Sequence, residues 1–310
     1  DVCWKFLPSQ KNNIYWLIKS GDRMEHYRIN GTTIITFSGG RTSGFLLHKI
    51  LENYNGKLPN DAYVVFDNTG KEMPQTLDFV NDCQKKWDVK IHWLEFIPNG
   101  ELAGFKEVTY ETASRNGEPF ERVIDFYTHR RKQNERIVGN PALLPNPIAR
   151  YCTRWLKENC NHLFMKSKGH ISWDMTLGLR YDEPRRVSRV KNKDTRNRVH
   201  RTPLYDDKVT AEIVNNFWRL NDFDLNLPVV NNETIHGNCD LCFLKSNKKM
   251  QFLINENPDR AKWWSEQETR TETFFRKNKP SYQKMIEDNL NEDQMSLFDD
   301  EDLGDCFCHD

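Results

Sequence analysis

Residues of three chemical kinds recur in this chain at spacings that suit a reactive site: cysteines, a glycine pair and arginines. Cys239 and Cys242 are separated by two residues and Cys306 and Cys308 by one, whereas Cys152 stands alone. Thiolates at such spacings bind zinc or an iron–sulfur cluster, and a close pair in a tail also suits thiol–disulfide exchange. The spacing itself leaves all three uses open.

The glycine pair lies in a short polar turn. Ser38-Gly39-Gly40 follows a β-branched run at 32–37 and precedes apolar residues at helical spacing in 45–51. Glycines let backbone amides approach an anion, and a following helix adds its dipole and unpaired N–H groups. Thr42 and Ser43 add hydroxyl donors. The pattern predicts a phosphate-binding loop, with an ordinary helix-capping turn as the alternative. It is not a Walker loop, because no Gly-Lys-Ser/Thr follows.

The arginines are concentrated in residues 180–201, which contain nine lysines and arginines and three acidic residues. Forked guanidinium groups suit phosphate or sulfate and stabilise charge on a leaving pyrophosphate. We therefore expect an anion site that includes Arg180. The alternatives are a solvated charged loop and a contact to nucleic-acid phosphates.

Asp67 follows the second strand that the pattern predicts, at 62–66. In open α/β sheets, ligands bind outside the carboxyl ends of the strands. We expect Asp67 to help hold a magnesium ion or a ribose, and the alternative is an Asx turn that starts the next loop.

The elements that would position these residues alternate along the chain. Strands are predicted at 32–37, 62–66, 89–96 and 171–179, and helices at 45–51, 77–87, 151–165 and 208–221. This rhythm predicts an α/β fold with a doubly wound parallel sheet and a small C-terminal helical module that contains cysteines. Residues 98–149 read as a loop-rich insertion or lid.

Composition bounds the class of protein. The 310 residues carry 45 basic and 45 acidic side chains, so the net charge is zero. No apolar run approaches the ~18 residues of a membrane span, and residues 1–20 show no secretory signal. Eight cysteines in such a chain indicate metal or redox chemistry. We expect a cytoplasmic protein with no membrane partner.

Three regions are expected: an N-terminal cap at 1–30, a nucleotide-binding α/β domain at 31–230, and a cysteine-rich metal-binding module with an acidic tail at 231–310. Trp263, Trp264, Phe274 and Phe275 should form the small core of the last module. Residues 287–310 carry ten acidic residues and no lysine or arginine.

Within this tail, Gln294-Met295-Ser296-Leu297-Phe298 is similar to the peptide that partners of bacterial sliding clamps insert into the clamp. The alternative is that Leu297 and Phe298 dock on the protein's own surface.

Five stretches, taken in order, resemble the PAPS reductase-like (phosphoadenosine phosphosulfate reductase-like) branch of the adenine nucleotide alpha-hydrolase-like superfamily, whose first motif is the PP-loop. They are Phe37-Ser38-Gly39-Gly40-Arg41-Thr42-Ser43, Phe66-Asp67-Asn68-Thr69-Gly70-Lys71-Glu72, Arg150-Tyr151-Cys152-Thr153-Arg154-Trp155-Leu156-Lys157, Gly178-Leu179-Arg180-Tyr181-Asp182-Glu183-Pro184-Arg185-Arg186 and Pro203-Leu204-Tyr205. The segment from Gly237 to Lys245, with the terminal Cys-Phe-Cys, resembles members encoded by bacteriophages, for which the compartment would be the host cytoplasm.

The resemblance implies a nucleotide-dependent enzyme of sulfur chemistry, and it implies residue roles. Nucleotide binding falls to Ser38, Gly39, Gly40, Arg41, Thr42, Ser43, Thr69, Gly70 and Arg186. Catalytic roles fall to Asp67, Lys157, Arg180 and Cys306. A 4Fe–4S cluster would be held by Cys152, Cys239, Cys242 and Cys308, with Zn²⁺ as the alternative and Mg²⁺ as an additional candidate ion.

Two reactions fit this resemblance. In the first, ATP adenylylates an acceptor, nucleic acid being one candidate, and sulfur then displaces AMP. In the second, a thiolate attacks a sulfonucleotide (PAPS or its relative APS), and sulfite is released. The rival from another class is a non-catalytic nucleic-acid or sliding-clamp adaptor with a structural zinc.

Overall fold

The computed structural model describes residues 25–230 and 233–289, and its centre is a six-stranded sheet with the order β4-β3-β2-β1-β5-β6. Every neighbouring pair of strands is parallel except β3 and β4, which are antiparallel. The predicted doubly wound α/β fold is confirmed. The strands are β1 (Thr33–Thr36), β2 (Ala62–Asp67), β3 (Ile91–Asn99), β4 (Leu102–Val108), β5 (Trp173–Thr176) and β6 (Arg198–Arg201).

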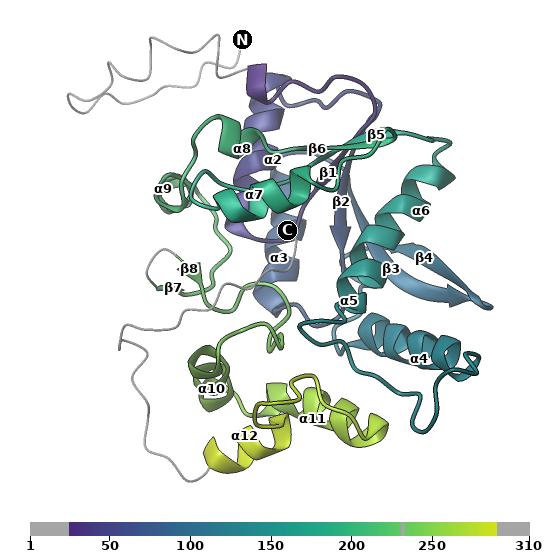
Figure 1. The fold of residues 1–310 in the computed structure, drawn as a ribbon. Coiled ribbons are helices and arrows are strands. Elements are labelled where there is room, and N and C mark those ends of the chain that lie inside the picture. Colours follow the sequence, from purple (N-terminus) through teal and green to yellow (C-terminus); the bar gives the residue numbers. More distant parts are fainter. Residues whose placement is uncertain (1–24, 231–232, 290–310) are drawn as a thin grey trace.

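Helices cover both faces of this sheet (Figure 1). Side chains alternate along a strand, so Val64 and Phe66 pack on one face, whereas Val65 packs on the other. The first face carries α2 (Arg41–Asn53), α3 (Pro74–Lys86) and α9 (Ala211–Leu220). The second carries α4 (Glu118–Lys132), α5 (Tyr151–Thr153), the π-helical turn η1 (Arg154–Glu158) and α6 (Asn159–Ser167). The shorter elements are α7 (Pro184–Lys191), α8 (Pro203–Asp206) and the antiparallel pair β7 (Val229–Val230) and β8 (Glu233–Thr234).

The expectation of a loop-rich insertion at 98–149 is wrong for much of that segment. The chain turns at Gly100 and Glu101, between the paired residues Asn99 and Leu102, and β4 returns antiparallel to β3. Gly100 has a φ of +60°, and glycine at the first central position of a two-residue turn is a hairpin signal because it tolerates positive φ. The helix α4 then begins with Glu118 and Pro119, which suit the first turn of a helix.

The C-terminal helices are α10 (Asn247–Glu256), α11 (Asp259–Thr271) and α12 (Tyr282–Asn289), grouped at one end of the molecule (Figure 1). The sequence pattern predicts that these helices form a small core of their own, and this prediction is wrong. Phe120 of α4 contacts the rings of Trp263, Trp264 and Phe275 with centroid distances of 5.4, 5.6 and 6.4 Å. Phe274 is half exposed rather than buried. One continuous core therefore joins these helices to the sheet.

Among the helices that the structure describes, none combines the length and the apolar character that crossing a membrane requires.

Candidate functional site

The polar turn after β1 has the conformation that its glycines allow. Gly39 has a φ of +79°, and a Cβ atom there would lie 2.5 Å from Cγ2 of Thr76. Only glycine meets both conditions without strain. Ser43 is buried and fixes the turn, since its hydroxyl donates to the Gly40 carbonyl at 2.9 Å and lies 3.0 Å from Oγ of Ser38.

The turn leads directly into the N-terminus of α2. Gly40 precedes the helix in an extended conformation, and no described side chain caps the first turn. The N–H groups of that turn therefore lack intrahelical acceptors and attract anions, aided by the helix dipole. On the other side, the segment after β5 approaches α2 closely, because a Cβ on Gly178 would lie 3.2 Å from Cα of Ser43.

A cavity of about 530 Å³ opens in front of this helix end. We call it the nucleotide cavity, after the ligand that the sequence analysis predicts for this turn. Its size falls within the range of pockets for small ligands. Arg180 reaches it from the segment after β5, and its Nη1 donates to Oγ1 of Thr42 at 3.0 Å. Arg185 and Arg186 of α7 line it as well. Glu183 orients both neighbouring arginines, since it pairs with Arg180 at 3.5 Å and with Arg186.

Arg41 also lines the nucleotide cavity, but its guanidinium group has partners within the protein. It forms a forked pair with Asp224, with bonds of 2.7 and 2.5 Å, and Nη2 donates to the Leu227 carbonyl at 3.0 Å. These bonds tie the segment after α9 to the start of α2. The bonds of Arg41 to Asp224 and Leu227 therefore compete with the nucleotide contact that the sequence analysis predicts for this side chain.

The C-terminal helices contribute a cation that the sequence pattern did not single out. Lys249 of α10 is buried and lines the nucleotide cavity, where its Nζ lies 3.4 Å from Oε2 of Glu233. A lysine in this position adds positive charge opposite the end of α2. No spacing rule marks Lys249, because it depends on how α10 docks.

Asp67 and Lys157 lie apart from the nucleotide cavity and line a second, smaller one. Oδ2 of Asp67 accepts a hydrogen bond from Nδ2 of Asn161 at 3.0 Å, and Oδ1 is buried. Burial raises the pKa of Asp67 to about 8, although the nearby Lys157 opposes this shift. Among the predicted catalytic residues, the structure thus separates Asp67 and Lys157 from Arg180.

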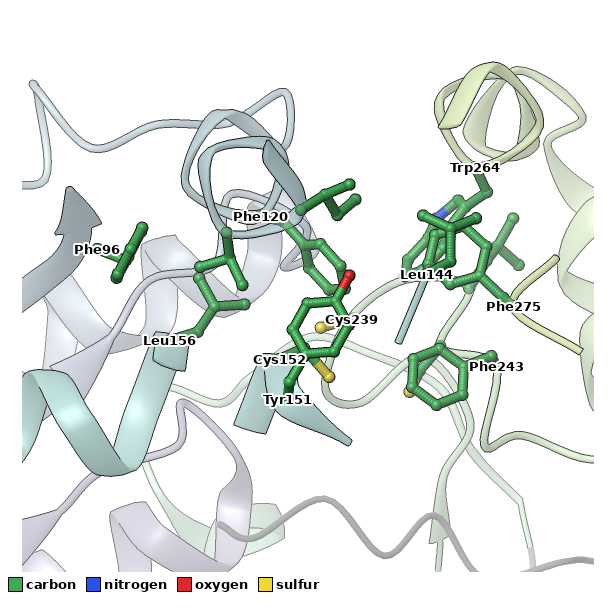
Figure 2. Packing of buried hydrophobic residues seen from close by; sticks show 14 of the residues in the cluster. Phe96, Phe120, Leu144, Tyr151, Cys152, Leu156, Cys239, Phe243, Trp264 and Phe275 are labelled. Atoms are coloured by element: carbon green, nitrogen blue, oxygen red, sulfur yellow. The ribbon is translucent and has the colours of Figure 1, made fainter. Parts of the chain in front are cut away.

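Cys152, Cys239 and Cys242 are buried in the same apolar cluster, together with Cys160. Figure 2 shows Cys152 and Cys239 within this cluster, beside Tyr151 and Phe120. Burial raises the pKa of Cys152 to about 11, so its thiolate needs a cation nearby. Within residues 25–230 and 233–289, no three His, Cys, Asp or Glu side chains converge as a metal site.

The segment that carries Cys239 docks on the loop after β2. Glu72 and Cys239 form an antiparallel bridge, the Asp240 amide donates to the Lys71 carbonyl at 2.7 Å, and Oγ1 of Thr69 lies 3.5 Å from Sγ of Cys239. We call this contact of residues 68–72 with residues 237–242, together with Cys152, the cysteine junction.

Asp240 is the centre of the cysteine junction. Its Oδ2 lies 3.1 Å from Nζ of Lys71, and its Oδ1 accepts from Nε1 of Trp264 at 2.8 Å and from the Leu241 amide at 2.7 Å. Lys71 also lies over the ring of Trp263, 5.0 Å from its centroid. Because all of these groups are at least partly buried, the network has little competition from water.

The remaining predicted residues divide between the two regions. Thr69 and Gly70 belong to the cysteine junction, where a Cβ on Gly70 would lie 2.9 Å from the Gly117 amide nitrogen. Ser38, Gly39, Gly40 and Thr42 line the nucleotide cavity. Cys306, Cys308 and the clamp-like peptide at 294–298 lie outside the described residues, and their roles stay predictions.

Comparisons with known proteins match this chain to a protein family and to two individual proteins. Residues 32–226 match the phosphoadenosine phosphosulfate reductase domain. The uncharacterized nin region protein ORF290 of Escherichia phage lambda is 26% identical over 228 residues, which cover 72% of this chain and 69% of that protein. Among solved structures, the U34-tRNA thiolase NcsA from Methanococcus maripaludis with its 4Fe–4S cluster is 12% identical, with a TM-score of 0.37 over 91% of this chain and 83% of that chain.

Proposed function

Because the chain belongs to the phosphoadenosine phosphosulfate reductase domain family, we propose that it is an enzyme that binds an adenine nucleotide in the nucleotide cavity and uses it for sulfur transfer. One observation carries this proposal. The uncapped end of α2, behind Gly39 and Gly40, faces a cavity whose other walls carry Arg180, Arg185, Arg186 and Lys249.

This arrangement suits a pyrophosphate group. Backbone N–H groups and a helix dipole favour negative charge at a fixed place, and guanidinium groups add forked donors. Such donors stabilise charge that develops on a leaving group without reorganising during the reaction. The proposed substrate is ATP. An acceptor hydroxyl or carbonyl oxygen attacks the α-phosphorus, pyrophosphate leaves, and a sulfur nucleophile then displaces AMP from the adenylylated acceptor.

Arg180 is the proposed catalytic cation. Its Nη1 is within hydrogen-bond distance of Thr42 in the first turn of α2, and its Nε lies 3.0 Å from Oδ1 of Asp182. The side chain is thereby held at the helix end where the leaving pyrophosphate would lie. Arg186 adds charge, while Glu183 holds both arginines in place.

The cysteine junction fits a thiolate-bound metal by the chemistry of its donors. Cys152, Cys239 and Cys242 contribute three thiols to one buried apolar cluster, although they do not converge as a ligand set among the described residues. Soft thiolates favour an iron–sulfur cluster or zinc. We propose that they hold a 4Fe–4S cluster, with Cys308 as the fourth ligand. Such a cluster, when bound, would supply a place to carry or activate sulfur.

The sulfonucleotide route shares the same cavity and differs in its product. A sulfonucleotide would place its phosphosulfate at the end of α2, and attack by the Cys306 thiolate on the sulfur would release the nucleotide and leave Cys306 S-sulfonated. A second thiol, supplied as the reductant, would then attack the Cys306 sulfur, release sulfite and form a disulfide with Cys306. No cysteine among the described residues lines the nucleotide cavity, so this route depends on the tail.

The experiment uses anaerobically prepared protein that retains its metal. ATP and adenosine 5′-phosphosulfate are titrated separately by calorimetry, and pyrophosphate and sulfite are then assayed. We expect ATP to bind and Lys249→Met to weaken binding by roughly tenfold or more, since a charged hydrogen bond contributes about 1.5–3 kcal/mol. Lys248→Met, in the exposed neighbouring residue, is the matched control.

Pyrophosphate release supports the adenylylation route, and sulfite release supports the sulfonucleotide route instead. If neither nucleotide binds to the metal-replete protein, the proposed function is wrong.

A further inference from the structure

The cavity that contains Asp67 lies at the carboxyl edge of the sheet, beneath α5, η1 and α6. Its volume is about 100 Å³, and it shares no lining residue with the nucleotide cavity. Thr36, at the end of β1, lines the smaller cavity, whereas Ser38, two residues later, lines the larger one. The two cavities are therefore neighbours on either side of the same strand end.

The smaller cavity contains buried polar atoms whose hydrogen bonds are incomplete. Oδ1 of Asp67 and Oδ1 of Asn161 have no partner in the described part of the chain, although Oδ2 of Asp67 accepts from Asn161. Asn161 is only 4% exposed. Buried polar atoms nearly always have partners, so this pair indicates a bound molecule that supplies them.

The charged side chains of the lining favour an anion. The lining carries Lys157, Lys193 and Arg198 as cations, and Glu158 lies 3.2 Å from Nζ of Lys193. Lys157 also interacts with the carboxyl groups of Asp67 and Glu72. The raised pKa of Asp67, about 8, keeps that carboxyl protonated at neutral pH. With Oδ2 accepting from Asn161, the proton is available on Oδ1 as a donor.

The helix that supplies Lys157 is irregular at this position. The turn at Arg154–Glu158 is π-helical, between the α-helical segments α5 and α6. Such wide turns are rare and frequently occur at functional sites. Here the π-helical turn carries Lys157 and Glu158, and both line the cavity.

The size and the remaining walls limit the occupant to a few heavy atoms. A water molecule occupies about 30 Å³ in the liquid, so the cavity holds about three waters and no nucleotide. Met175, Leu177 and Val190 form an apolar wall. An anion that enters such a place must be fully paired, because burying an unpaired charge costs free energy.

We propose that this cavity binds a small sulfur-carrying anion, hydrosulfide or sulfite, next to the nucleotide. The proposal rests on the proposed function, because adenylylation requires a sulfur nucleophile and the sulfonucleotide route releases sulfite. Lys157 and Arg198 supply the positive charge, Asp67 donates a hydrogen bond, and Asn161 accepts one from the hydrogen of a protic anion.

The test is anaerobic calorimetry on the full chain with sodium hydrosulfide and sodium sulfite, each with and without saturating AMP. We expect one anion to bind per chain, with AMP leaving its affinity unchanged because the two cavities share no residue. Lys157→Met should weaken anion binding by at least about tenfold and leave AMP binding intact. Lys166→Met, an exposed lysine on α6, is the matched control.

Val190→Leu provides an independent variant that keeps every charge and fills part of the cavity, and it should also weaken anion binding. Tighter binding of hydrosulfide supports a sulfur donor, and tighter binding of sulfite supports a product. Competition by AMP, or binding of neither anion, overturns the inference. If anions fail to bind while ATP binds and turns over, the inference alone falls; if anions bind and no nucleotide does, the proposed function falls instead.

Discussion

The nucleotide cavity and the cysteine junction lie at the same edge of the sheet, yet they differ in almost every physical property. The cavity is open, about 530 Å³ in volume, and lined by arginines whose partners are nearby acidic side chains. The junction is buried, and its charged pair of Lys71 and Asp240 contacts Trp263 and Trp264.

This difference indicates two kinds of occupant. Partly solvated arginines exchange one anionic partner for another at modest cost, which suits a substrate that enters and leaves. A buried network costs much more to disturb, because each unpaired group stays desolvated. We therefore expect ligand exchange at the cavity and a group that stays bound at the junction.

The strongest test removes the centre of the junction. Asp240→Ala leaves the Lys71 ammonium buried without its carboxylate, which should lower the free energy of unfolding by about 3 kcal/mol or more. Urea denaturation measures the change. Asp222→Ala is the control, because Asp222 pairs with Lys86 at the surface and its loss should not shift the midpoint measurably. Equal effects would remove the distinction between the two regions.

The next test disturbs the turn that lines the nucleotide cavity. Gly39→Ala combines a φ of +79° with a Cβ 2.5 Å from Thr76, so it should lower the free energy of unfolding by about 2–3 kcal/mol and abolish ATP binding. Gly56→Ala has a similar φ of +83° and open space around the Cβ. This control should cost only about 1 kcal/mol. ATP binding by the Gly39 variant would show that the turn does not hold the phosphates.

A third variant tests whether Arg41 stabilises the fold or binds the nucleotide. Arg41→Lys loses the forked pair with Asp224, which should lower the free energy of unfolding by about 1–2 kcal/mol. ATP affinity should change by less than about threefold, measured by calorimetry beside Arg219→Lys on the exposed side of α9. A large loss of affinity at unchanged stability would instead make Arg41 a nucleotide ligand.

A fourth test concerns the pH dependence of stability. Folded Asp67 keeps its proton up to pH about 8, whereas the unfolded chain loses it near the ordinary pKa of 3.8. The folded state then binds more protons in this window, so its stability falls as the pH rises. Asp67→Asn should remove this contribution, which is at most about 1.4 kcal/mol per pH unit.

Melting temperatures of the parent and of Asp67→Asn, compared between pH 5 and pH 9, measure this effect. The melting temperature of the variant should rise relative to that of the parent as the pH increases. A constant difference across the range would show that Asp67 titrates normally.

Local signals predicted the conformation of the turn after β1, because Ser38, Gly39 and Gly40 form a contiguous motif between a strand and a helix. Phosphate binding by this turn stays a prediction. Local rules also account for the hairpin turn at Gly100 and Glu101 and for the start of α4, although the loop-rich interpretation overlooked both. Such features depend on a few neighbouring residues, which the sequence displays directly.

Features that depend on distant residues were not predictable. Asp67 and Ser38 both follow neighbouring strands, but strand alternation turns Asp67 to the face of Val65, beneath α6. The spacing of residues in the sequence does not reveal which face of the sheet α6 covers. The partner of Arg41 is 183 residues away, and Lys249 reaches the cavity only because α10 docks there.

The shared core has a consequence for the order in which the chain acquires its structure during synthesis. Phe120 packs against Trp263, Trp264 and Phe275, which the ribosome adds about 150 residues later. At roughly 5–20 residues per second, this aromatic side chain waits about 7–30 seconds for its partners. Nascent chains that end before α11 should therefore be chaperone clients, released once the last helices emerge.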